Sequence, residues 1–251
     1  MEPMTPAPPP PGPPAGGGYQ PPAAPGRPGL PWDRGKDFNS LLETCKLIIT
    51  APGRAYAAVK EKGDYGSPLI FALVFIVVGA VAQVVWQLIG LGGSTAWMSR
   101  LGSMNPEMGE MMGEMAAVSA GSAIGGLIGG IVGGVIGLFI ISAIFHLCLQ
   151  LVGGLKDSSA GFEGSFRVVS YAQVVQLAAL VPFVGPLLGL VWGIILYVIG
   201  LASVHRTTQG KAVAAVLIPI AVCCICIILA VFVFAASIAA MIGGAAAGAG
   251  N

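Results

Sequence analysis

Four long apolar runs without a charged residue constrain the fold of this chain more than any other feature. They cover residues 69–91, 116–151, 168–204 and 213–242. The shortest of them would form a helix roughly 34 Å long, enough to cross the roughly 30 Å hydrocarbon core of a bilayer. Only 9% of the residues are charged, whereas soluble domains carry about 25%. The sequence therefore predicts an all-α integral membrane protein.

The four runs are predicted to supply five transmembrane helices. The first and last runs give one each, and residues 116–151 give a glycine-rich second helix. The first half of that helix is either a tilted extension or a separate re-entrant segment. As one helix, residues 168–204 would be roughly 55 Å long, nearly twice the hydrocarbon core. The prolines within Val181–Pro186 break it, so two spans are expected, at about 168–182 and 185–204.

The positions of lysine and arginine predict the orientation in the membrane. Seven of the twelve lie before Pro68, two in residues 153–167 and two in residues 205–211. With five spans, all eleven lie on one side, and only Arg100 lies on the other. Loops on the cytoplasmic side are enriched in lysine and arginine. A cytoplasmic N-terminus is therefore predicted.

The remaining segments complete the predicted domain organisation. Residues 1–31 are rich in proline and glycine, as expected of a disordered tail that acts as a spacer. Residues 32–68 form a basic, amphipathic juxtamembrane region, which lies either among lipid headgroups or on the protein's own loops. Residues 69–242 form the membrane domain, and residues 243–251 form a flexible glycine and alanine tail.

Glycine recurs at every fourth position of the predicted second helix. This spacing leaves one helix face without side chains, so that another helix can approach closely. The predicted helix-packing residues, here called the glycine ladder, are Gly121, Gly125, Gly129, Gly133 and Gly137.

The chain carries none of the common catalytic or nucleotide-binding motifs. GxGxxG after a strand, GxxxxGK[ST], HExxH and GxSxG are all absent. The five cysteines lack the paired spacing of a zinc site. The methionine-rich segment 92–115 has no accompanying histidine or cysteine repeat to indicate a copper site. We expect no catalytic residue, metal or cofactor, and no nucleic acid partner; the protein is not predicted to be an enzyme.

His146, followed one helical turn later by Gln150, is the one acidic or basic side chain within the predicted spans. Intramembrane ionisable residues often mark functional sites. A histidine facing a helix bundle is more often a hydrogen-bonded packing residue. A transporter or channel remains the alternative, with a polar path lined by His146, Gln150, Tyr171, Gln173 and Gln176.

Several short motifs resemble the Yip domain family, the Ypt/Rab-interacting membrane proteins and their bacterial relatives. They occur at residues 161–172, 181–186, 190–192, 200–205 and 211–212, and at residues 64–69 before the first span. The last is similar to the Asp-Leu-Tyr-Gly-Pro motif of eukaryotic members, with one residue missing after Asp64 and Ser67 inserted before Pro68. The residues that the resemblance singles out for interaction are Asp64, Tyr65, Gly66, Pro68, Tyr171, Pro182, Gly185, Pro186 and His205.

The resemblance implies a five-helix fold with a cytoplasmic N-terminus. Eukaryotic members of the family bind Rab GTPases and one another, and they shape or sort membranes between the endoplasmic reticulum and the Golgi. Bacterial members lie in the inner membrane. The simple tail and the altered 64–69 motif favour a bacterial protein of the inner (plasma) membrane, with the Golgi or endoplasmic reticulum membrane as the alternative. A Rab partner applies only to a eukaryotic protein.

These observations lead to the hypothesis of a non-catalytic membrane scaffold or adaptor. Its expected partners are membrane lipids and either a second copy of the chain or another membrane protein. Small-solute or ion transport is the competing hypothesis.

Overall fold

The structure, a computed structural model, describes residues 27–89 and 123–248. Every element within these ranges is helical, which confirms the all-α prediction for this part of the chain. In chain order they are α1 (Pro31–Arg34), α2 (Phe38–Thr50), α3 (Pro52–Ala58), α4 (Gly66–Leu88), α7 (Ala123–Leu151), α8 (Gly161–Ala172), the 3-10 helix η1 (Gln173–Leu180), α9 (Gly185–Val204) and α10 (Gln209–Gly248).

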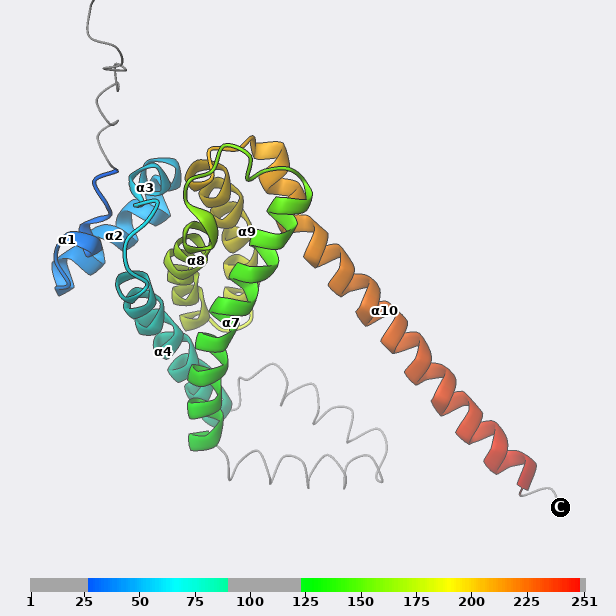
Figure 1. The fold of residues 1–251 in the computed structure, drawn as a ribbon. Coiled ribbons are helices and arrows are strands. Elements are labelled where there is room, and N and C mark those ends of the chain that lie inside the picture. The colour runs from blue at the N-terminus through cyan, green and yellow to red at the C-terminus, as the bar shows by residue number, and fades with distance from the viewer. Residues whose placement is uncertain (1–26, 90–122, 249–251) are drawn as a thin grey trace, which may run out of the picture.

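Within the described residues, four stretches are long and apolar enough to cross a membrane. They are α4, residues 125–151 of α7, α9, and residues 209–234 of α10. The short helices α1 to α3 gather at one end of the bundle (Figure 1). We call residues 27–65 the cap, this end of the bundle the cap end, and the opposite end the far end. The predicted fifth span, at about 168–182, corresponds to α8 and η1, and the count of five stays a prediction.

Together, α8 and η1 make a continuous helical rod in the centre of the bundle. The rod packs against α4, α7 and α9, and every residue from 164 to 172 is buried. The sequence placed residues 153–167 in a polar loop, but the helix already begins at Gly161. That boundary was wrong because Arg167 is buried beside Glu163 at hydrogen-bonding distance, so its charge does not require water.

The predicted break between the two halves of residues 168–204 is confirmed. The 3-10 helix ends at Leu180, Phe183 adopts a left-handed backbone (φ 63°), and α9 starts at Gly185. A Cβ at Gly185 would lie 1.9 Å from the carbonyl oxygen of Ala178. Only glycine lets the start of α9 approach the backbone of η1 this closely.

The glycine-rich half of α7 continues the same helix, so residues 123–134 form no separate re-entrant segment. Residues 116–122 lie outside the described residues, as does Gly121 of the ladder. The contact with α4 uses the neighbouring glycines: a Cβ at Gly134 would lie 2.7 Å from Ile76, and one at Gly130 would lie 3.7 Å from Ala80.

The cap includes residues that the sequence assigned to the tail. Leu30 is fully buried, and the amide of Gly29 donates to the carbonyl of Ala58 at 2.9 Å. The guanidinium of Arg27 donates to the carbonyl oxygens of Ser203 (2.8 Å) and Tyr56 (3.2 Å). Residues 27–31 are thus packed, and the predicted tail of 1–31 was too long at this end. Residues 1–26 lie outside the described ranges.

The cap is joined to the bundle by Tyr56, a fully buried side chain of α3. Gly200 of α9 makes room for its ring, because a Cβ there would lie 3.0 Å from Tyr56 and 2.5 Å from Val168. The hydroxyl of Tyr56 lies 3.4 Å from the carbonyl oxygen of Val168 in α8. Burial raises the pKa of this phenol well above its usual value.

The last helix, α10, runs away from the bundle (Figure 1). Its first turns pack against α7, with Ala215 beside Cys148 and Leu149, whereas residues 221–234 are exposed. The helix continues to Gly248, beyond the predicted end of the span at residue 242. The expected flexible tail at 243–251 is therefore helical over most of its length, consistent with the high helix propensity of its alanines.

Candidate functional site

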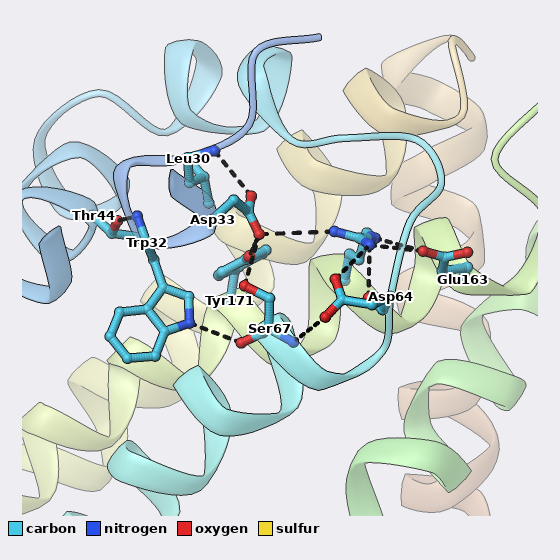
Figure 2. A network of polar contacts seen from close by, with 9 residues as sticks. Leu30, Trp32, Asp33, Thr44, Asp64, Ser67, Glu163 and Tyr171 are labelled. Atoms are coloured by element: carbon cyan, nitrogen blue, oxygen red, sulfur yellow. Dashed lines mark hydrogen bonds and ion pairs between the residues drawn. The ribbon is translucent and has the colours of Figure 1, made fainter. Parts of the chain in front are cut away.

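A buried polar network joins the cap to the start of α4 and to α8 (Figure 2). Its cation is Arg167, whose side chain is fully buried. Glu163 Oε1 accepts hydrogen bonds from Nε (3.0 Å) and Nη2 (2.7 Å) of Arg167, and Nη2 also donates to the carbonyl of Asp64 at 2.7 Å. A buried guanidinium must be paired because its desolvation is costly. Arg167 thereby fixes α8 against the loop that precedes α4.

Asp33 of α1 is the anion at the centre of this network, with a side chain only 2% exposed. Its Oδ1 accepts hydrogen bonds from the hydroxyls of Tyr171 (2.7 Å) and Ser67 (2.9 Å), and it lies 4.0 Å from Nη1 of Arg167. Its Oδ2 accepts from the amide of Leu30 at 3.0 Å. One carboxylate thus links the cap, α4 and α8.

Trp32 adds two further hydrogen bonds beside Asp33. Its indole Nε1 donates to the carbonyl of Ser67 at 2.8 Å, and its amide donates to the hydroxyl of Thr44 at 2.9 Å. The ring packs edge-on against Phe71 of α4. The indole is therefore held by both its polar and its apolar surface.

The residues 64–69 that resemble the family motif lie in this network. Asp64 Oδ2 accepts from the amide of Ser67 at 3.1 Å, the ring of Tyr65 lies 5.2 Å from that of Phe166, and α4 starts at Gly66, with Pro68 buried in its first turn. Ser67, the residue inserted before Pro68, forms hydrogen bonds through its amide, its carbonyl and its hydroxyl. The structure thus brings Tyr171 and the motif together.

Sequence reasoning missed Asp33, Trp32 and Arg167 as members of the site. Asp33 and Trp32 lie in a segment that was assigned only as amphipathic, and they reach Tyr171 and Ser67 through contacts distant in sequence. For Arg167 a local signal existed: Glu163 lies four residues earlier, the spacing of a helical ion pair.

A second polar chain connects the two histidines of the protein. Nδ1 of His146 lies 3.1 Å from the hydroxyl of Ser165, which lies 2.9 Å from Nε2 of His205. Nδ1 of His205 lies 2.7 Å from the hydroxyl of Ser158. Neutral imidazole has one donor and one acceptor nitrogen, so all three of these hydrogen bonds can form with both histidines neutral.

Charged groups of the cap lie next to this histidine chain. Glu61 forms ion pairs with Arg206 after α9 and with Arg27 (3.4 Å), and it accepts a hydrogen bond from Ser159. The Ser159 bond and the two arginines lower the pKa of Glu61. Burial, together with His146 and Arg27, lowers the pKa of His205 to about 4, although Glu61 acts in the opposite direction.

The other predicted polar residues have separate surroundings. Gln150 is exposed, and Gln173 donates weakly to the carbonyl of Val169 in its own helix, at 3.4 Å. Gln176 lies against Gly79 of α4. With Tyr171 bonded to Asp33 and His146 to Ser165, the five residues proposed for a transport path do not share one hydrogen-bonded array in the described part of the chain.

No group of three metal-binding side chains occurs among the described residues. Cys45 and Cys148 are buried, whereas Cys223, Cys224 and Cys226 are exposed on α10. Burial raises the pKa of the Cys45 thiol to about 11, so this thiol is neutral near pH 7. The arrangement in both polar networks is suited to holding helices and the cap together.

Comparison with known proteins identifies the family of this chain. A family model described as the Yip1 domain matches residues 46–231, a range that includes the motif at Asp64, the central rod and the histidine chain. No curated protein and no solved structure matches the chain. Because the family model covers well over half of the sequence, the chain belongs to the Yip1 domain family of membrane proteins.

Proposed function

We propose that this protein is a non-catalytic membrane scaffold or adaptor, which joins a second copy or another membrane protein through the glycine ladder of α7. One observation carries the proposal: a Cβ at Gly129, Gly133 or Gly137 would meet no other atom within 4 Å. These three ladder glycines are thus not used for packing against another helix of the described chain. In membranes, such faces allow helices to approach closely, and the close contact stabilises association.

The cap supplies a second surface, suited to lipid headgroups. On α2, Phe38 is 71% and Leu42 is 51% exposed, and both lie near the exposed cations Lys36 and Lys46. Exposed apolar side chains beside lysine are typical of a helix at a membrane surface. The opposite face of α2, with Cys45 and Ile48, packs on the protein. One face of α2 is therefore suited to lipid headgroups, and the other packs on the protein. Each of the two locations predicted for this region thus has support.

The charge distribution supports a cytoplasmic cap. Arg206 pairs with Glu61 of the cap, and Lys211 donates to the carbonyl of Gly153. The cations after α9 thus lie at the cap end with those of the cap, the arrangement expected for the cytoplasmic side. For a bacterial protein the site of action is the inner membrane, and the partner is a membrane protein. In a eukaryotic protein the exposed Tyr65 would be available to a Rab-type GTPase.

The decisive experiment measures the assembly state of the full chain by native mass spectrometry, in nanodiscs formed directly from the expressing membrane. We expect an oligomer or a stoichiometric partner, lost in Gly133→Leu. Gly126→Leu is the matched control, because Gly126 also has no neighbour within 4 Å but lies off the ladder. A bare monomer of the unmodified chain, or equal assembly in both variants, would contradict the proposal.

Transport is the second candidate, and the histidine chain is the observation that favours it. His146, Ser165, His205 and Ser158 are linked by hydrogen bonds that could pass a proton between the cap end and α7. The test is flux of protons and of a broad solute panel into proteoliposomes. This candidate requires flux that is lost in His146→Ala and retained in Gln150→Ala; no flux from the unmodified chain would dismiss it.

A further inference from the structure

A crevice of about 290 Å³, lined by both polar and apolar residues, lies between α4, α7 and η1. One wall is glycine: Gly126, Gly130 and Gly134 of α7. The facing walls carry three carboxamides, Gln83, Gln87 and Gln176. None of these residues belongs to the Arg167 network or to the ladder at Gly129, Gly133 and Gly137. The crevice is therefore distinct from the surfaces already described.

The depth of the crevice follows from the length of α4. Gly79 and Gln87 lie roughly 20 Å and 32 Å along the helix from Gly66. The crevice thus extends from about the headgroup level at the far end towards the middle of the membrane. At its deeper end the amide of Gln176 lies against Gly79, where a Cβ would be only 3.2 Å from its Oε1. Glycine at this position makes room for the amide.

The three carboxamides form no hydrogen bond with another residue in the part of the chain that is described. Each offers one carbonyl acceptor and two N–H donors, and unpaired amides in an apolar environment cost free energy. Gln83 and Gln87 are exposed at the mouth of the crevice. Two carboxamides of α4 one helical turn apart and a third on η1, all lining the crevice together with the glycine wall, supply several donors and acceptors without any charge.

We propose that this crevice binds a neutral ligand rich in hydroxyl groups, either a free sugar or polyol or the sugar headgroup of a neutral lipid. Hydroxyl groups both donate and accept, so they match carboxamides, and the absence of charged lining residues disfavours ions. The glycine wall has no side chains that would fill the space beside the carboxamides. This site goes beyond the proposed assembly role and does not depend on it.

Binding to the full chain in phosphatidylcholine nanodiscs tests the site with two probes, free glucose and glucosyl diacylglycerol incorporated in the bilayer. Native mass spectrometry and ligand-induced thermal shift are the readouts. We expect one probe to bind and the Gln83→Leu/Gln87→Leu variant to bind it at least roughly tenfold more weakly, a loss of about 1.4 kcal/mol. Gly126→Leu, which places a side chain in the crevice where its Cβ has no neighbour within 4 Å, should have the same effect.

Two controls separate this site from the assembly face. Gln150→Leu removes an exposed carboxamide of α7, and Gly129→Leu adds a side chain to the ladder; both should bind as the unmodified chain does. Loss of lipid binding in the crevice variants identifies a headgroup, and loss of glucose binding identifies a free solute. Failure of both probes to bind the unmodified chain overturns the proposal. The proposal is also overturned if Gly126→Leu changes the assembly state while the unmodified chain binds neither probe, because the crevice would then be a protein interface.

Discussion

The hydroxyl of Tyr171, in the central rod, donates a 2.7 Å hydrogen bond to the carboxylate of Asp33 in the cap. The same oxygen of Asp33 accepts from Ser67 at the start of α4, so this one atom connects three separate helices. Neither side chain of the pair has appreciable contact with water. A hydrogen bond to a buried carboxylate contributes more than one between neutral groups.

We predict that Tyr171→Phe lowers the free energy of unfolding by about 1.5 to 3 kcal/mol, the usual range for a hydrogen bond to a charged group. The midpoint of denaturant or thermal unfolding in one mild detergent measures the change. Tyr65→Phe is the control, because Tyr65 is 42% exposed and its ring contact with Phe166 survives the change. Equal midpoints for the two variants would show that the Tyr171–Asp33 bond contributes no measurable stability.

Among the charged residues of the network, Arg167 should be the one whose substitution destabilises the fold most. Arg167→Met leaves Asp33 and Glu163 without their cation, and breaking a buried pair in this way costs about 3 to 5 kcal/mol. The yield of monodisperse protein in fluorescence-detected size exclusion should therefore collapse. Arg54→Met, at an exposed position of α3, controls for the loss of one positive charge. A normal yield for Arg167→Met would show that the network is not needed for folding.

How far the sequence could predict the structure is clear from the two ends of the central rod. The turn after Leu180 was predictable because Pro182, Gly185 and Pro186 act on their own backbone and immediate neighbours. The start at Gly161 was not, because a hydropathy pattern treats Arg167 as an isolated charge that needs water. Its pairing with the carbonyl of Asp64 spans 103 positions of the chain, and no periodicity reveals such a contact.

The candidate sites show the same limit. Tyr171 and Asp64 were predicted from a resemblance to short motifs, and they do lie in one network. Asp33, their common partner, is 138 positions from Tyr171 and carries no local signal. The ladder glycines were predicted from spacing alone, but spacing cannot say that Gly134 packs on α4 while Gly133 is open. That difference depends on where α4 lies, which is a property of the tertiary structure.

Stability should decrease as the pH falls from about 6.5 to about 4. In the folded protein the pKa of His205 is about 4, against an ordinary value of 6.5. The unfolded chain therefore binds a proton in this window that the folded protein does not, and linkage makes unfolding easier as protons become available. The expected loss is up to about 3 kcal/mol, and it is complete below the folded pKa.

Unfolding midpoints measured at intervals between pH 7.5 and pH 5 test this expectation. In His205→Gln the amide cannot titrate, so the decline over this range should flatten. Glu61→Gln is the comparison, because a carboxylate with a lowered pKa loses its contribution only below its ordinary value of 4.5, outside the range measured. An unchanged slope in His205→Gln would assign the pH dependence to other groups.

The approach of α9 to η1 gives the sharpest steric prediction. A Cβ at Gly185 would lie 1.9 Å from the carbonyl oxygen of Ala178 and 2.8 Å from its carbonyl carbon. Both are backbone atoms, so no rotamer change relieves the overlap. Gly185→Ala must therefore displace the start of α9 or the end of η1. We expect a loss of about 1 to 3 kcal/mol, as for overpacked core sites.

Gly210→Ala is the matched control, because Gly210 lies in the first turn of α10 with no neighbour within 4 Å of a Cβ. Alanine is favoured over glycine in helices by about 1 kcal/mol, so this variant should unfold at or above the midpoint of the unmodified chain. Opposite shifts for the same chemical change would show that close backbone packing at Gly185 is essential to the fold. If both variants instead unfold at the same midpoint, the approach of α9 to η1 in solution is looser than the structure describes.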